Sequence, residues 1–377
     1  MAGLVAVRRR HRRVGIRRRR RRLHACCFAN RRHRSRGAVI GERVRMVREY
    51  LSMTQQGLAE AARVTQPAIS QIEKGGPVTD ETLIAIAAAT GYCTDFFRRG
   101  TLPDLPELSL RYRKRASSRR SDDKRVRAHC RQGIELIDQL ERRAQLPPVA
   151  LTPVHDDLDD DCIEELAVSV RNQLGIGPDD PVANVMRAVE RGGVVVFGAS
   201  VNVDKHDAAS VWPNYPVGRP IVCYARGWPG DRQRLSIAHE IGHLVLHQTR
   251  KVEADRAETE AFRFGAAFMI PKQAAVEAID APVTLRRLAW AKSKWGVSIS
   301  ALIRRSYDLR IIDTLRYQSL MKQLSARGWR KKEPVDVPVE QPALLPELLR
   351  LAYKTDRPAA LANRTGLSPL AIRDLIA

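Results

Sequence analysis

Apolar residues between positions 37 and 98 recur every three or four residues, which is the spacing of short amphipathic helices. Helices after the first are expected to begin near Thr54, near Thr65 and at Thr79 or Asp80, because these side chains cap helix N-termini. The pattern therefore predicts an all-helical domain of four or five short helices over residues 37–98. Its inward-facing residues are Ile40, Val44, Val47, Leu51, Leu58, Ala59, Ile69, Ile72, Leu83, Ile86 and Ala87.

The pattern changes between residues 151 and 320, where apolar runs of strand length stand among helical stripes. One helix carries Ile163, Leu166, Val170 and Leu174, and another covers residues 182–191. Residues 194–197 and 220–224 are short apolar runs, typical of buried strands. Another helix begins near Arg232. The pattern predicts a small α+β domain in a chain that is otherwise mainly α-helical.

Two segments lie outside these domains. Residues 99–150 combine prolines with a basic cluster and one amphipathic helix around residues 134–146, which favours a basic linker with a helix. Residues 321–377 follow the α+β domain and carry two more helical stripes, which predicts a C-terminal helical extension.

Charge is distributed unevenly along the chain. The sequence holds 65 Lys and Arg against 42 Asp and Glu, a net charge of +23. Fifteen arginines lie between Arg8 and Arg36, so about +8 remains for the other 341 residues. We expect residues 1–36 to be a disordered tail with nonspecific DNA affinity, although a translation start placed too far upstream, or a targeting role, would also account for them. A basic excess favours polyanionic partners.

The cysteines and the hydropathy exclude several classes of protein. No Cys-x-x-Cys pair occurs, so a disulfide framework or an all-cysteine zinc site is not expected. No apolar run approaches the ~18 to 20 residues that a membrane span needs, and the arginine-rich start lacks the apolar centre of a secretory signal. We expect a cytoplasmic, nucleoid-associated protein without membrane contact. The cysteines are Cys26, Cys27, Cys93, Cys130, Cys162 and Cys223.

The run His239-Glu240-Ile241-Gly242-His243 falls within the helix that begins near Arg232. Two histidines four residues apart lie on one helix face, about 6 Å apart along the axis, and can share a tetrahedral zinc ion. Glu240 projects about 100° away and can accept a proton from a water molecule that the metal activates. An exposed helix turn could carry the same letters by chance. The apolar residues around the motif predict a buried helix, which favours a zinc peptidase site.

A zinc site of this kind needs a third protein ligand. His247 continues the four-residue spacing, but eight residues of helix place it about 12 Å from His239, too far to share one ion. Glu258 and Glu260 lie on the following helix and point about 200° apart, so at most one faces the metal. Each shares its face with apolar residues, and periodicity leaves the choice between them open.

Residues 232–243, together with 258–271, resemble the ImmA/IrrE family of metallo-endopeptidases. The resemblance implies a zincin-like fold, Zn²⁺ as cofactor, His239, His243 and Glu260 as metal ligands, and Glu240 as the catalytic residue. Phe262 stands where the family usually has asparagine, and Gly265 replaces a common alanine. Members of the family cut regulatory proteins, which implies a protein substrate such as a repressor or toxin partner.

Residues 53–59 and 66–75 are similar to the second and recognition helices of the Xre (Cro/C1-type) helix-turn-helix family. The resemblance implies a double-stranded DNA operator as partner and binding as a homodimer. Arg63 sits where the turn usually has glycine. In the recognition helix, which carries Pro67 in its first turn, the implied base readers are Gln66, Ser70 and Gln71, with Gln55 and Lys74 holding phosphates.

Three functions are compatible with this combination of domains. The leading expectation is a transcriptional regulator whose zinc endopeptidase domain, over residues 151–320, cleaves a partner regulator or its own chain. The alternative is an antitoxin or repressor of a toxin-antitoxin or mobile-element system, in which the zinc domain binds or senses without cutting. A pure enzyme that uses the helix-turn-helix only as a scaffold is the third.

Overall fold

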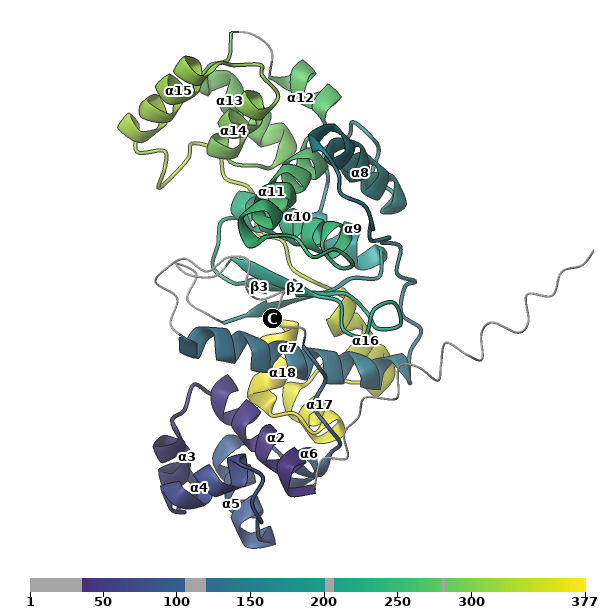
Figure 1. Cartoon of the computed structure of the whole chain (residues 1–377), viewed down its shortest axis with the longest axis vertical. Helices are drawn as coiled ribbons and strands as arrows, with labels where there is room; N and C mark the ends of the chain where they lie inside the picture. The colour runs from purple at the N-terminus through teal and green to yellow at the C-terminus, as the bar shows by residue number, and fades with distance from the viewer. Residues whose placement is uncertain (1–35, 106–119, 201–206, 280–281) are drawn as a thin grey trace, which may run out of the picture.

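The computed structural model describes residues 36–105, 120–200, 207–279 and 282–377. The arginine tract predicted over residues 1–36 lies outside these ranges except for its last residue. In Figure 1 the helices of the N-terminal domain lie at one end of the molecule, a small sheet lies at the middle, and α13 to α15 lie at the other end. The chain is mainly α-helical with a small sheet, which confirms the predicted fold class.

The N-terminal domain forms the helices that the apolar stripes predicted. Thr54, Thr65 and Thr79 cap three of them, each accepting a hydrogen bond from the backbone N–H three residues later. Arg63, at the end of α3, adopts the left-handed conformation with φ 56° and ψ 40°, the position at which the resemblance places glycine. The helices are α2 (Arg36–Tyr50), α3 (Gln55–Ala62), α4 (Gln66–Glu73), α5 (Asp80–Thr90) and α6 (Thr94–Arg98).

The segment predicted to be a linker contains a long helix that is part of the core. Helix α7 (Arg120–Glu141) packs against α2 on one side and against β1 and β3 on the other. Arg43 of α2 donates to Glu135 of α7, with Nη1 3.2 Å from Oε2. The helix predicted around residues 134–146 is thus present, but it begins earlier, at Arg120, and ends at Glu141. Its apolar stripe predicted an amphipathic helix but could not show that α2 and the sheet cover it.

The sheet has the strand order β1-β3-β2. Strand β1 (Val195–Ala199) pairs in parallel with β3 (Ile221–Ala225), and β2 (Ala208–Val211) pairs with β3 antiparallel. Two of these strands were predicted within a residue or two; β2, with four residues, was not predicted.

Each face of the sheet belongs to a different hydrophobic core, because neighbouring residues of a strand point to opposite sides. Val195, Phe197 and Cys223 face the helices of the N-terminal domain, α7 and the C-terminal helices. Val196 and Val222 face the helices that carry the motif. The sheet is thus the layer between the two halves of the molecule.

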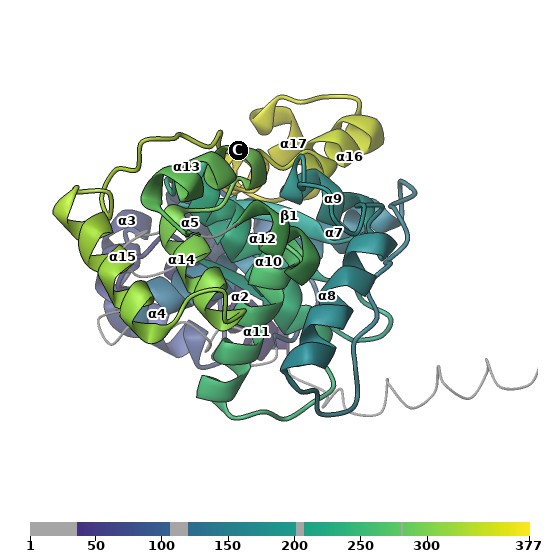
Figure 2. The same cartoon turned by 90° about the horizontal axis from the view of Figure 1, so that it is seen from above.

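The second core is built by helices on the far side of the sheet. Helices α10 and α11 form its centre, and in the view from above α8 and α15 lie on opposite sides of α10 (Figure 2). The helices are α8 (Asp160–Gln173), α9 (Val185–Arg191), α10 (Gly230–Leu246), α11 (Ala254–Met269), α12 (Lys272–Ala278), α13 (Leu285–Trp295), α14 (Ile299–Asp308) and α15 (Thr314–Ala326).

The C-terminal segment returns to the sheet instead of extending away from it. Its helices α16 (Leu344–Tyr353), α17 (Pro358–Thr365) and α18 (Pro369–Ile376) belong to the core of the N-terminal half. Tyr50 of α2 donates to Asp374 of α18, with Oη 2.7 Å from Oδ2. Two helices were predicted after residue 328, and the structure has three after α15. The prediction did not say where they pack, since an apolar stripe does not show which surface buries it.

A buried carboxylate anchors the start of α16. Glu190 of α9 accepts hydrogen bonds from the backbone N–H groups of Ala343 and Leu344, at 3.0 to 3.1 Å. Burial raises the pKa of Glu190 to about 7, against these two hydrogen bonds, which lower it. Glu190 therefore holds its proton to a higher pH in the folded protein than in the unfolded chain.

The raised pKa of Glu190 predicts how the stability of the folded protein depends on pH. Because the unfolded carboxyl titrates near 4.5 and the folded one near 7, the free energy of unfolding should fall as pH rises through that interval. The loss should reach up to about 3 kcal/mol relative to Glu190→Gln, which has no proton to lose. Thermal unfolding of both proteins between these pH values measures it. An equal pH dependence in the two proteins would contradict the prediction.

Among the described residues, no helix combines the length and the apolar content that crossing a membrane requires.

Candidate functional site

Helices α10 and α11 approach closely at two glycines. A Cβ atom on Gly242 would lie 3.2 Å from the Cα of Ala261, and one on Gly265 would lie 3.0 Å from the backbone N of His239. The absence of side chains at these points lets the two backbones come together. Residues of α11 that face α10 therefore reach the side chains of the His239–His243 turn.

Three potential metal ligands meet between the two helices. His239 Nε2 and His243 Nε2 lie 3.0 Å apart, and the carboxylate of Glu258 lies 3.2 Å from His243 Nε2 and 3.6 Å from His239 Nε2. One ligand atom from each residue lies within 4.8 Å of the others. Both imidazoles are buried and Glu258 is partly buried. Two imidazole nitrogens and one carboxylate oxygen form a donor set that fits a zinc ion with an open fourth position.

The electrostatics favour a charged carboxylate at this point. Burial alone would raise the pKa of Glu258, but hydrogen bonds from His239 and His243 outweigh it and lower that pKa to about 2. Glu258 is therefore ionised at neutral pH, which is the form that binds a cation.

Glu260, the predicted third ligand, does not lie with the two histidines. Glu258 lies beside them instead, whereas Glu260 points to the other side of α11. There its carboxylate accepts hydrogen bonds from Arg250 at 3.1 Å and from Arg256 at 2.6 Å. The physical reason is the rotation between residues two apart on a helix, which separates the two side chains. Only the packing of α11 on α10 decides which of them faces the two histidines.

His247 lies between His243 and Glu260 and is not part of the group of potential metal ligands. Its Nδ1 lies 2.9 Å from Nδ1 of His243, and its Nε2 lies 3.1 Å from Glu260 Oε2. Burial, followed by the neighbouring His243, lowers the pKa of His247 to about 4. The ring is therefore neutral near pH 7, and it links His243 to Glu260. The exclusion of His247 on helix geometry agrees with this arrangement.

Glu240 lies on the side of α10 that faces the sheet. Its Oε2 accepts a hydrogen bond of 2.7 Å from Ser210 Oγ of β2. Both residues are buried. Sequence reasoning missed Ser210, because β2 is short and the serine is about 30 positions from the motif, so only strand pairing brings it there.

The predicted DNA-binding residues gather on α3 and α4. Pro67, Gln71 and Lys74 are exposed, and Gln66 and Ser70 are half-buried. The amide of Gln66 donates to Gln55 Oε1 at 3.0 Å, so these two predicted contacts touch each other.

A buried carboxylate fixes Gln55. The amide of Gln55 donates to Glu73 Oε2 at 2.9 Å, and Arg48 of α2 donates to both oxygens of Glu73, at 2.5 and 2.9 Å. Burial would raise the pKa of Glu73, but the hydrogen bonds from Arg48 and Gln55 lower it overall. Glu73, which sequence reasoning missed, therefore ties α2, α3 and α4 together beneath the exposed face.

Two family models match the chain. Residues 189–307 match the peptidase M78 model, whose description is IrrE N-terminal-like domain. Residues 44–97 match a model described as Helix-turn-helix. The chain joins an Xre-type helix-turn-helix domain to an ImmA/IrrE-like domain. No curated protein matches it. The helix-turn-helix domain is of a DNA-binding type, and the ImmA/IrrE-like domain is of a metallopeptidase type.

The two departures from the ImmA/IrrE pattern both lie at the candidate metal site. Phe262 is one helical turn after Glu258, and its ring centroid lies 4.4 Å from that of His239. With 38% of its surface exposed, the ring borders the site on the solvent side. Gly265 lies against the backbone of His239, as described above.

The contact of Gly265 predicts the effect of restoring the usual alanine. Its Cβ would lie 3.0 to 3.2 Å from backbone atoms of His239, so Gly265→Ala should push α11 from α10 and destabilise the protein by about 1–3 kcal/mol. Gly57→Ala is a suitable control, because in α3 the new methyl group meets only Thr54 Oγ1 at 3.4 Å and alanine favours helix. Thermal unfolding should show opposite signs for the two variants; a stabilising Gly265→Ala would refute the close contact.

Proposed function

We propose that this protein is a DNA-binding transcriptional regulator whose zinc-dependent endopeptidase domain cleaves a partner regulator or its own chain. The observation that carries the proposal is the convergence of His239, His243 and Glu258, with Glu240 next to His239 in the sequence. This arrangement supplies three metal ligands of the type zinc prefers and a carboxylate that is not one of them. A structural zinc site would have a fourth protein ligand and no need of the carboxylate.

Each residue has a distinct role in the proposed reaction. His239, His243 and Glu258 would hold Zn²⁺, which when bound supplies Lewis acidity at a peptide carbonyl. Glu240 would accept the proton of the attacking water and later pass it to the leaving amine. Ser210 would hold the Glu240 carboxylate in position through its 2.7 Å hydrogen bond. His247 would orient the His243 ring from behind, as outer partners of metal ligands do.

The N-terminal domain would direct this activity to an operator. Gln66, Ser70 and Gln71 would contact bases in the major groove, Lys74 would contact phosphate, and Pro67 would begin the recognition helix. Gln55 would reach phosphate from the start of α3 while held by Glu73. We propose that the operator is bound by a homodimer.

The proposed cleavage is tested by comparing the proteomes of cells that carry wild type, Glu240→Gln or His239→Ala. Glu240→Gln keeps the three ligands and removes the base, so a substrate should accumulate while the purified variant still binds zinc. His239→Ala should stabilise the same substrate. If no protein accumulates in either variant strain, and the full-length chain is cleaved to the same extent in the variants as in wild type, the peptidase proposal fails.

The alternative, an antitoxin or repressor that binds without cutting, predicts a different result for the same two variants. In that case Glu240→Gln would behave as wild type in every cellular assay, while His239→Ala would not. The arrangement of Ser210 on Glu240 favours cleavage, because a binding site has no use for an oriented base.

A further inference from the structure

The positive charge of the described residues lies far from the helix-turn-helix domain. Residues 37–98 contain six Lys and Arg against seven Asp and Glu, a net charge of −1. Residues 285–332, which we call the basic lobe, contain thirteen against two, a net charge of +11. This exceeds the +8 that the whole chain carries outside its arginine tract. The domain expected to hold DNA is therefore not the most basic of the described parts of the chain.

The basic lobe comprises α13, α14, α15 and the turn that follows, at the end of the molecule opposite to α3 and α4 (Figure 1). Some of its cations are used internally, such as Arg305 with Glu164 and Arg304 with Asp308. Eight others are exposed, and within the described residues no carboxylate lies within ion-pair distance of them. These eight are Arg286, Lys294, Arg310, Lys322, Arg327, Arg330, Lys331 and Lys332.

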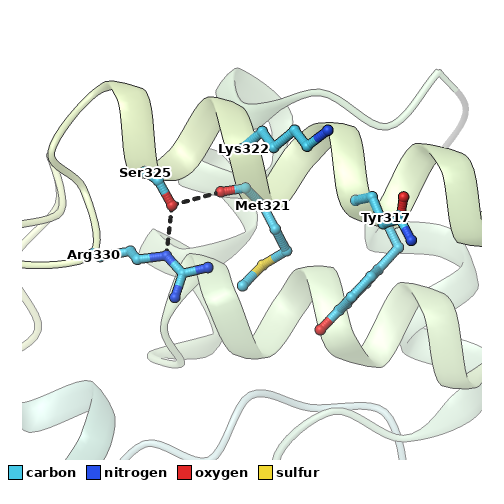
Figure 3. Close-up of a pocket in the computed structure, with 6 residues that line it drawn as sticks. Tyr317, Met321, Lys322, Ser325 and Arg330 are labelled. Atoms are coloured by element: carbon cyan, nitrogen blue, oxygen red, sulfur yellow. Dashed lines mark hydrogen bonds between the residues drawn. The ribbon is translucent and has the colours of Figure 1, made fainter.

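An open groove runs along α15 within the basic lobe (Figure 3). Its volume is about 430 Å³, and it is lined by Tyr317, Gln318, Met321, Lys322, Ser325 and Arg330. Arg330 Nε donates to Ser325 Oγ at 2.6 Å, and Ser325 Oγ donates to the backbone oxygen of Met321 at 2.9 Å. These bonds hold the Arg330 guanidinium beside the groove while its terminal nitrogens stay available. An aromatic ring, a thioether and two cations therefore line one surface.

We propose that the basic lobe binds a single-stranded nucleic acid, outside the helix-turn-helix domain and independently of it. Its phosphates would pair with the exposed cations, of which Lys322, Arg330 and Lys331 are nearest the groove or follow it directly. A base would pack against Tyr317 and Met321. Cationic grooves with an aromatic platform bind single strands in this way, because every base has a π-face and every nucleotide a charge. A duplex would use the cations but leave the groove empty.

The test measures salt-dependent affinity of the full chain for a labelled oligothymidylate and for a duplex without operator sequence. The lobe variant combines Lys322→Glu, Arg330→Glu and Lys331→Glu. The matched control combines Arg350→Glu, Arg357→Glu and Arg373→Glu, which are also exposed and change the net charge equally. The arginine tract is present in every protein, so its contribution cancels in the comparison.

We expect the lobe variant to bind the oligothymidylate at least tenfold more weakly than the control at physiological salt. Its slope of log affinity against log salt should be about 2 smaller, since each single-strand phosphate contact contributes ~0.7. Tyr317→Leu should weaken oligothymidylate binding about tenfold and leave duplex binding unchanged. Thermal unfolding of each variant checks that the fold is kept.

Three results would overturn the proposal. The lobe variant could match the control in both affinity and slope. The lobe variant could lose duplex affinity as strongly as single-strand affinity, with Tyr317→Leu having no effect, which would make the lobe a duplex surface. Finally, polyglutamate binding could fall by the same factor as oligothymidylate binding, which would make it a general anion surface.

Discussion

Replacing Glu258 with glutamine is expected to weaken zinc binding more than about 100-fold, which exceeds the ~10- to 100-fold effect typical of residues behind the ligands. Glu258 is the carboxylate beside both histidines, and its low pKa shows that their nitrogens stabilise its charged form. Glutamine keeps the shape of the side chain and removes the charge. Competition with a fluorescent zinc chelator at neutral pH measures the affinity.

Glu260→Gln is the matched control for this experiment, because the same helix carries it two residues later. It touches the site only through His247, so zinc binding should weaken at most about tenfold. Its main effect should be on stability, because Arg250 is 4% exposed and would keep only the exposed Asp157 as a charged partner, besides the backbone oxygen of Leu246. Loss of a buried ion-pair partner costs about 3 kcal/mol. If Glu260→Gln abolished zinc binding while Glu258→Gln kept it, the ligand assignment would be reversed.

Replacing Glu73 with alanine should destabilise the helix-turn-helix domain by about 3–5 kcal/mol. The Glu73 side chain is 1% exposed and pairs with Arg48, which is 13% exposed, so its removal leaves a largely buried cation without its carboxylate. Gln55 loses its acceptor as well. Hydrogen exchange of the α3 and α4 amides in the full chain measures the loss locally, because these amides should exchange much faster in the variant.

Glu60→Ala is the control for this prediction. Glu60 is exposed on α3 and accepts a hydrogen bond only from the exposed Gln56, so its replacement should change stability by less than about 0.5 kcal/mol. The contribution of Glu73 to stability should also depend on pH. Its pKa is lowered in the folded protein, so the advantage of wild type should be full above the unfolded value of 4.5 and diminish as pH falls below it. A pH-independent difference would mean that packing, not charge pairing, accounts for the effect.

Local features of this protein could be read directly from its sequence. The caps at Thr54, Thr65 and Thr79 act within three residues of themselves, so the helices of the N-terminal domain were predicted almost to the residue. The spacing of His239, Glu240 and His243 likewise fixes their relative directions on one helix. The two family matches cover the segments that contain these features.

Features that depend on contacts between distant segments could not be predicted in this way. Glu258 and Glu260 each lie on an apolar stripe, and the choice between them rests on the close approach of α11 to α10 at Gly242 and Gly265. Ser210 reaches Glu240 only because β2 pairs with β3.

The largest difference concerns the segments predicted to be a linker and an extension. Helix α7 and helices α16 to α18 share one core with the N-terminal domain and one face of the sheet. The sequence by itself determined most of the helices, the apolar face of each, and the relative placement of His239, Glu240 and His243 on one helix. Only the tertiary structure decided which apolar faces meet, because periodicity encodes the direction of a side chain relative to its own helix and not the identity of its neighbour.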